Sequence, residues 1–137
     1  MTSVPLVIDA SVAAKWIKPE VHSEYAAHVL QGPYTLFAPD LLWKSVQRQE
    51  IAPGEAQEGL RVLLRYPITI VPGQSLITTA LDIALHYQQT VYDALYVAMA
   101  TSRDCQLVTA DRALHSGLKN TPLQDHILWI EDVPLQD

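Results

Sequence analysis

Short apolar runs alternate with longer segments of helical periodicity along almost the whole chain, and this alternation constrains the fold more than any other feature. The runs expected to form strands are 4–8, 34–38, 68–71, 106–109 and 127–130. Strands that alternate with helices are typical of a mainly parallel sheet covered on both faces. We therefore predict an α/β fold with a central, mainly parallel sheet flanked by helices.

The segments between these runs carry the expected helices, at 9–17, 23–30, 41–49, 53–65, 75–85 and 91–100, with a short one after Asp111. Residues 91–100 are almost all apolar, and such a helix normally lies at the centre of a fold. The chain has 137 residues, of which 49% are hydrophobic and 18% charged. That length and composition predict one domain, 1–137, with a sizeable core.

The charge balance and the single cysteine exclude several classes of protein. Nine Lys and Arg residues against 15 Asp and Glu give a formal net charge of −6, which disfavours a dedicated nucleic-acid-binding protein. It does not exclude an enzyme that uses its acids to bind metal ions. Cys105 alone can form neither an internal disulfide nor a Cys-rich zinc site, and we expect it to be buried near a strand. No apolar run approaches the roughly 20 residues that span a bilayer, and no signal segment is apparent, so we expect a cytoplasmic protein with no membrane partner.

Three carboxylates follow strands or begin a helix. Asp9 ends the first strand, Asp111 lies just past the strand 106–109, and Asp93 lies at the start of the apolar helix 91–100. Open parallel sheets bind ligands outside the carboxyl ends of their strands, so Asp9 and Asp111 are expected at the same edge. Three acids at one edge repel each other unless a cation neutralises them, and oxygen ligands suit Mg²⁺ or Mn²⁺.

Each of these residues also has a purely structural interpretation. Asp9 and Asp111 can cap the helices that follow them, and Asp93 can interact with the dipole of its own helix. Ser11 and Thr109 are each two residues from an acid, and their hydroxyls can support a ligating carboxylate or simply serve a turn. On the structural interpretation, the chain is a small α/β domain without a metal site.

Four pieces of sequence, in this order, resemble the PIN-domain family, and more narrowly the toxin subunits of VapBC toxin–antitoxin modules. They are Val-Ile-Asp-Ala-Ser-Val at 7–12, Ala-Pro-Asp-Leu-Leu at 38–42, Val-Tyr-Asp-Ala-Leu-Tyr-Val-Ala at 91–98 and Leu-Val-Thr-Ala-Asp-Arg at 107–112. The resemblance spans nearly the whole chain. It implies a PIN fold and a metal-dependent endoribonuclease that cleaves RNA in the cytoplasm.

By matching motifs, the resemblance implies that Asp9, Asp93 and Asp111 are catalytic acids that bind Mg²⁺ or Mn²⁺, with Ser11 and Thr109 as supporting hydroxyls. It also implies a homodimer and a cognate antitoxin that blocks the acidic site. Apolar faces around Trp16, Trp43 and Leu60 can serve a dimer or belong to the core.

The chain departs from the family after Ala-Pro-Asp-Leu-Leu, where the family normally has a glutamate in the next helix. Here Leu42 runs directly into Trp43-Lys44-Ser45-Val46, as if about two helical turns, near seven residues, were missing. Aligned without such a gap, Ser45 stands where the acid is expected, and Asp40 and Glu50 are the candidate substitutes. The departure leaves two hypotheses: a ribonuclease toxin, impaired or not, and an inactive PIN-like module that retains only antitoxin or RNA binding.

Overall fold

Five strands form one fully parallel sheet in the computed structural model, which describes residues 3–42, 44, 57, 61 and 64–134. The strands are β1 (Val4–Ile8), β2 (Tyr34–Pro39), β3 (Ile68–Val71), β4 (Gln106–Thr109) and β5 (Ile127–Trp129). Their order across the sheet is β3-β2-β1-β4-β5, and every neighbouring pair is parallel. The predicted parallel sheet is therefore confirmed, with β1 at its centre.

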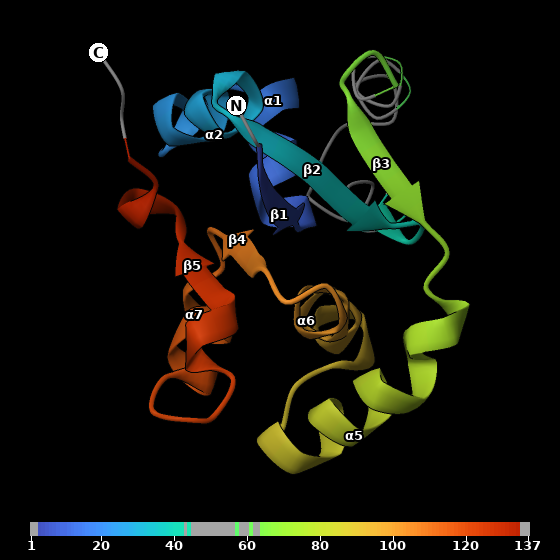
Figure 1. Ribbon diagram of the computed structural model, residues 1–137. Helices are drawn as coiled ribbons and strands as arrows, with labels where there is room; N and C mark the ends of the chain where they lie inside the picture. The colour runs from blue at the N-terminus through green and yellow to red at the C-terminus, as the bar shows by residue number, and fades with distance from the viewer. Residues whose placement is uncertain (1–2, 43, 45–56, 58–60, 62–63, 135–137) are drawn as a thin grey trace.

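Helices cover both faces of this sheet (Figure 1). They are α1 (Ala10–Ile17), α2 (Ser23–Gln31), α5 (Ile77–Tyr87), α6 (Val91–Ser102) and α7 (Arg112–Leu118), with short 3₁₀ turns η1 (Gln74–Leu76), η2 (Gln124–His126) and η3 (Ile130–Asp132). The connection from β1 to β2 runs in one direction across the sheet, and the connections from β3 to β4 and β5 run in the other. Right-handed crossovers therefore put α1 and α2 on one face and α5, α6 and α7 on the opposite face.

The core is built around β1 and α6. Leu6, Val7 and Ile8 are consecutive and all buried, as expected for a central strand covered on both faces. All seven residues of α6 from Ala94 to Ala100 are buried, which confirms that the apolar helix is central. α5 packs on α6 on the side away from the sheet (Figure 1), so α5 is an outer layer.

Most predicted boundaries agree with the structure, and the exceptions have local causes. The segment predicted to be helical from 75 begins as the 3₁₀ turn η1, in which the Leu76 amide donates to the Gly73 carbonyl, and α5 then continues to Tyr87. β5 ends at Trp129 rather than Ile130 because its partner in the ladder, Thr109, is the last residue of β4. The predicted helices 41–49 and 53–65 lie almost entirely outside the described residues. No helix in the described part of the chain is long and apolar enough to cross a membrane.

The central place of α6 predicts the effect of a cavity there. Met99 has a fully buried side chain, and we expect Met99→Ala to lower the free energy of unfolding by about 2–5 kcal/mol. Val21→Ala, at a residue that is 70% exposed, is the control and should change stability by less than about 0.5 kcal/mol. Chemical denaturation of the purified variants measures both values, and equal effects would contradict the central role of α6.

Candidate active site

The strand order reverses between β1 and β4. The carboxyl ends of these two strands lie next to each other at one edge of the sheet. β1 pairs with β2 on one side and with β4 on the other, although β4 comes much later in the chain. In open α/β sheets, ligands bind in the crevice outside the carboxyl ends of the strands at such a reversal. Asp9 directly follows β1, and Thr109 is the last residue of β4. The topology therefore brings these two predicted site residues together.

Three donors bind the Asp9 carboxylate. Its Oδ1 accepts hydrogen bonds from the Ser11 hydroxyl at 2.5 Å and from the Val12 amide at 3.2 Å, the second of which caps α1. Its Oδ2 accepts one from the Thr109 hydroxyl at 2.5 Å. Because a carboxylate offers about four acceptor positions, these three bonds leave Oδ2 able to take one further partner. Asp9 is thus both a helix cap and a positioned acid.

Backbone amides also bind both hydroxyls that donate to Asp9. The Ala110 amide donates to the Ser11 oxygen at 2.9 Å, and the Asp111 amide donates to the Thr109 oxygen at 3.0 Å. An ionised carboxylate can only accept, so each hydroxyl donates its proton to Asp9 and accepts the amide proton with its oxygen. The network joins the β1–α1 junction to the β4–α7 junction and orients the carboxylate for whatever binds it.

Burial makes the charge on Asp9 costly. The residue is only 5% exposed, and desolvation raises the pKa of its carboxyl from 3.8 to about 6. The hydrogen bonds from Ser11, Thr109 and Val12 oppose this rise, while repulsion from Asp93 adds to it. A buried acid with such a raised pKa, at the reversal of a sheet, is typical of functional sites.

Asp93 lies in the first turn of α6, and Thr90 is the residue that caps the helix. The Thr90 hydroxyl oxygen accepts a hydrogen bond from the Asp93 amide at 3.1 Å. Burial and then repulsion from Asp111 raise the pKa of the Asp93 carboxyl, and the Thr90 side chain partly opposes this rise. Thr90 is not among the predicted site residues, although a threonine three residues before the acid follows the spacing of a capping box.

Asp111 is the cap of α7, as its structural interpretation proposed. Its Oδ1 accepts hydrogen bonds from the amides of Ala113 at 3.0 Å and Leu114 at 3.3 Å. Capping does not prevent the same carboxylate from acting at the sheet edge, since its repulsion is felt at Asp93.

Repulsion therefore links the three predicted acids in a chain from Asp9 to Asp93 to Asp111. Within residues 3–42 and 64–134 and the few described between them, no three Asp, Glu, His or Cys side chains are arranged to hold one metal ion directly. The donor chemistry still suits Mg²⁺, because that ion keeps several waters and needs only one or two carboxylates. A site in which all three acids serve one ion stays a prediction.

The remaining candidates lie outside this site or outside the described residues. Asp40, a candidate substitute for the missing glutamate, accepts a hydrogen bond from the Gly73 amide at 3.1 Å. Ser45 and Glu50 are not among the described residues, so the region of the missing turns is not described. Cys105 is buried, and burial raises the pKa of its thiol, in agreement with the structural role we predicted.

The raised pKa of Asp9 predicts that the free energy of unfolding depends on pH when a chelator keeps divalent ions away from the site. The folded state binds this proton more tightly than the unfolded chain, so the ionised carboxylate lowers stability by about 3 kcal/mol above pH 6, and the cost disappears as the pH falls to about 4. We expect Asp9→Asn to be more stable than the wild type at pH 8, with the difference shrinking toward pH 4. Denaturant titrations across this range test it, with the exposed Asp104→Asn as control. A difference that does not vary with pH would contradict the assignment.

Known proteins are similar to this chain in both sequence and fold. The family model of the PIN domain matches residues 6–117. Ribonuclease VapC3 of Pyrobaculum aerophilum is 33% identical over 119 residues, covering 80% of this chain and 91% of the relative.

Solved structures agree in fold. A toxin–antitoxin complex from Klebsiella pneumoniae matches with a TM-score of 0.67 at 14% identity, covering 90% of this chain and 95% of that one. VapC20 of Mycobacterium tuberculosis, a toxin that cleaves the sarcin–ricin loop, matches with a TM-score of 0.66 at 11% identity, covering 81% and 93%. The family match over most of the chain and the VapC relative at 33% identity show that this chain belongs to the PIN-domain family and resembles its VapC ribonucleases.

Proposed function

We propose that this chain is a divalent-metal-dependent endoribonuclease and the toxin component of a toxin–antitoxin pair. The observation that carries the proposal is the buried carboxylate of Asp9, held at the reversal of the sheet by Ser11 and Thr109 and repelled by Asp93. Carboxylates that only cap helices have no reason to be placed where they repel one another. Membership of the PIN family and the VapC relative support the same activity.

In this proposal, Asp9, Asp93 and Asp111 hold Mg²⁺ or Mn²⁺ directly or through water. Such an ion would stabilise the charge that develops on the attacked phosphate and would activate a water molecule. The chain itself provides orientation. Ser11 and Thr109 fix the Asp9 carboxylate, Thr90 fixes the turn that carries Asp93, and the fold excludes bulk water from Asp9.

The proposed partners follow from the same site. An RNA phosphate can approach an edge rich in carboxylates only when cations neutralise it. A cognate antitoxin that covers this edge must likewise bring positive charge. Such a protein would act in the cytoplasm, where its RNA substrates are.

The missing glutamate favours a second candidate, a PIN-like module that has lost catalysis and retains only antitoxin or RNA binding. The sequence has no acid at the position after Leu42 where the family carries one. Three acids in place of four weaken the binding of any second ion. Reinserting the two turns with their glutamate separates the candidates, since it would raise the rate only in a chain whose remaining site is competent.

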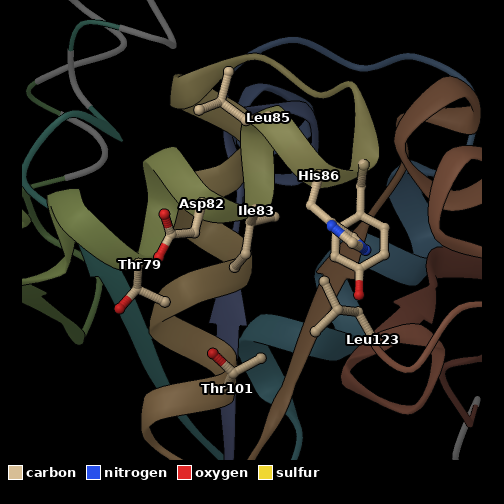
Figure 2. A pocket seen from close by; sticks show the side chains of 8 residues that line it. Thr79, Asp82, Ile83, Leu85, His86, Thr101 and Leu123 are labelled. Carbon is tan, nitrogen blue, oxygen red and sulfur yellow. The ribbon is translucent and has the colours of Figure 1, made fainter.

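We further propose that the chain forms a homodimer through α5. Ile77, Leu81 and Leu85 recur every four residues along its outer face and are 50%, 45% and 73% exposed. Leu85 also lines a depression of about 750 Å³, where Figure 2 shows it with Ile83 and His86 of α5, Thr101 of α6 and Leu123. None of the residues that line it belongs to the predicted active site. An apolar stripe beside a depression suits a self-complementary contact between two copies.

The catalytic proposal predicts metal-dependent cleavage that requires Asp93. With a single-stranded RNA and Mg²⁺ or Mn²⁺, we expect cleavage by the wild type and at least about a 100-fold lower rate for Asp93→Asn, since an amide cannot neutralise a cation. Asp104→Asn removes an exposed acid elsewhere and should keep the wild-type rate. Cleavage by neither protein at high enzyme concentration would favour the inactive module, and equal cleavage by both would indicate a contaminating nuclease.

The dimer proposal predicts that a charge in the α5 stripe separates the copies. Leu81→Glu buries an unpaired carboxylate in the contact, so we expect dimerisation to weaken by about 100-fold or more. Sedimentation velocity measures the change. Gln31→Glu, on the exposed end of α2 across the sheet, is the charge-matched control. A wild type that is already monomeric, or a Leu81→Glu dimer, would contradict the proposal.

A further inference from the structure

A cluster around Trp129 lies beside the carboxylate edge and has no part in the chemistry proposed above. The guanidinium carbon of Arg112 lies 4.0 Å from the centre of the Trp129 ring. The imidazole of His22 contacts the same ring edge-on at 5.8 Å between centroids, and that of His115 contacts it in a tilted geometry at 5.5 Å. The indole amine donates a hydrogen bond to Glu131 at 3.2 Å. These contacts fix the ring and, with it, the arginine on its face.

The register of the sheet places this cluster in line with the predicted acids. Trp129 pairs with Thr109, and Val108 pairs with Ile8, the residue before Asp9. Asp9, Thr109 and Trp129 therefore lie at the carboxyl ends of three successive strands. Neighbouring strands are about 4.8 Å apart, so the Trp129 platform is about 10 Å along the edge from Asp9. An RNA strand that crossed this edge with one phosphate at the acids would carry another of its phosphates toward Arg112.

The Arg112 guanidinium is accessible and preorganised. Its side chain is 66% exposed, and its ion pair with Glu131 is long, at 3.9 Å. The same Glu131 oxygen also contacts the indole of Trp129 and the imidazole of His22, at 3.1 Å from the latter, so Arg112 has only a share of it. A guanidinium has five donors, and stacking on an aromatic ring reduces the entropy lost when it binds.

We propose that Arg112 binds a backbone phosphate of single-stranded RNA next to the one that is cleaved. Trp129 is its platform, and Glu131 is a weak competitor that holds the guanidinium in place when no phosphate is present. This inference rests on the proposed ribonuclease function and adds the residue that positions the substrate. The metal ions act at the phosphate that is cleaved, so another phosphate on this acidic edge gains from a separate fixed cation.

The chain offers a matched control. Arg103 also lies over an aromatic ring, with its guanidinium carbon 4.2 Å from the centre of Phe37. It caps the C-terminal end of α6, whereas Asp93 lies in the first turn of that helix. Ten residues of helix separate them, about 15 Å. Arg103→Gln removes the same charge and the same kind of stacking contact away from the proposed path.

The test compares steady-state cleavage of a short single-stranded RNA by the wild type, Arg112→Gln and Arg103→Gln across salt concentrations. For Arg112→Gln we expect KM to rise about tenfold, kcat to stay within about twofold, and the slope of log KM against log salt to fall by about 0.7. Arg112→Lys should recover part of the KM, because it keeps the charge but not the flat stack. A purely structural role would lower the active fraction, and so kcat, without a change in slope. A KM and slope for Arg112→Gln that match those of Arg103→Gln would overturn the inference.

Glu131→Gln gives an independent test in the opposite direction. Without its competitor, Arg112 should bind phosphate better, so we expect KM to fall about threefold in the wild-type background and to stay unchanged in an Arg112→Gln background. An equal fall in both backgrounds would show a general effect of charge and overturn the inference.

The outcomes separate this inference from the function on which it rests. If the wild type cleaves and the arginine variants do not differ, only the inference fails. If the wild type does not cleave, the proposed activity fails, and fluorescence anisotropy with the same labelled RNA then tests Arg112 alone. A dissociation constant about tenfold higher for Arg112→Gln than for Arg103→Gln supports it, and equal constants overturn it.

Discussion

The hydrogen bonds between Asp9 and the hydroxyls of Ser11 and Thr109 are the interaction on which the rest of the site depends. They join the ends of β1 and β4, which are adjacent in the sheet but about 100 residues apart in the chain. Each hydroxyl donates to the carboxylate and accepts from a backbone amide, and these bonds together hold the carboxylate in one orientation. Because Asp9 also caps α1, a helix, two strands and the proposed metal site share one buried side chain.

This arrangement carries a cost that function explains better than stability does. An ionised carboxylate with a pKa near 6 destabilises the folded state at neutral pH, and electrostatic repulsion from its neighbour Asp93 adds to this effect. A chain selected for stability alone would gain by replacing either acid. A cation that neutralises these carboxylates would turn the destabilisation into a gain, since it binds the folded state and so stabilises it. The overall charge of −6 is then in part a property of the site.

The strands and the central helix could be predicted from the sequence because burial on both sides leaves continuous apolar runs, as in Leu6 to Ile8 and Ala94 to Ala100. The places of the three acids in the fold could be predicted because each follows a strand or begins a helix, while their role as metal ligands stays a prediction. The stack of Arg112 on Trp129 could not, since the two residues meet only through the parallel register of β4 and β5. Thr90 could have been found from its spacing to Asp93.

The central claim is that Asp9, Asp93 and Asp111 serve one divalent ion together. A titration with Mg²⁺, followed by NMR of the aspartate side-chain carboxyl carbons, tests it most directly. We expect the three signals to shift in one saturable step with a common midpoint, while that of the exposed Asp104 stays in place. Signals that do not move, or that move with different midpoints, would contradict a shared ion and leave the three acids as helix caps and charges of the fold.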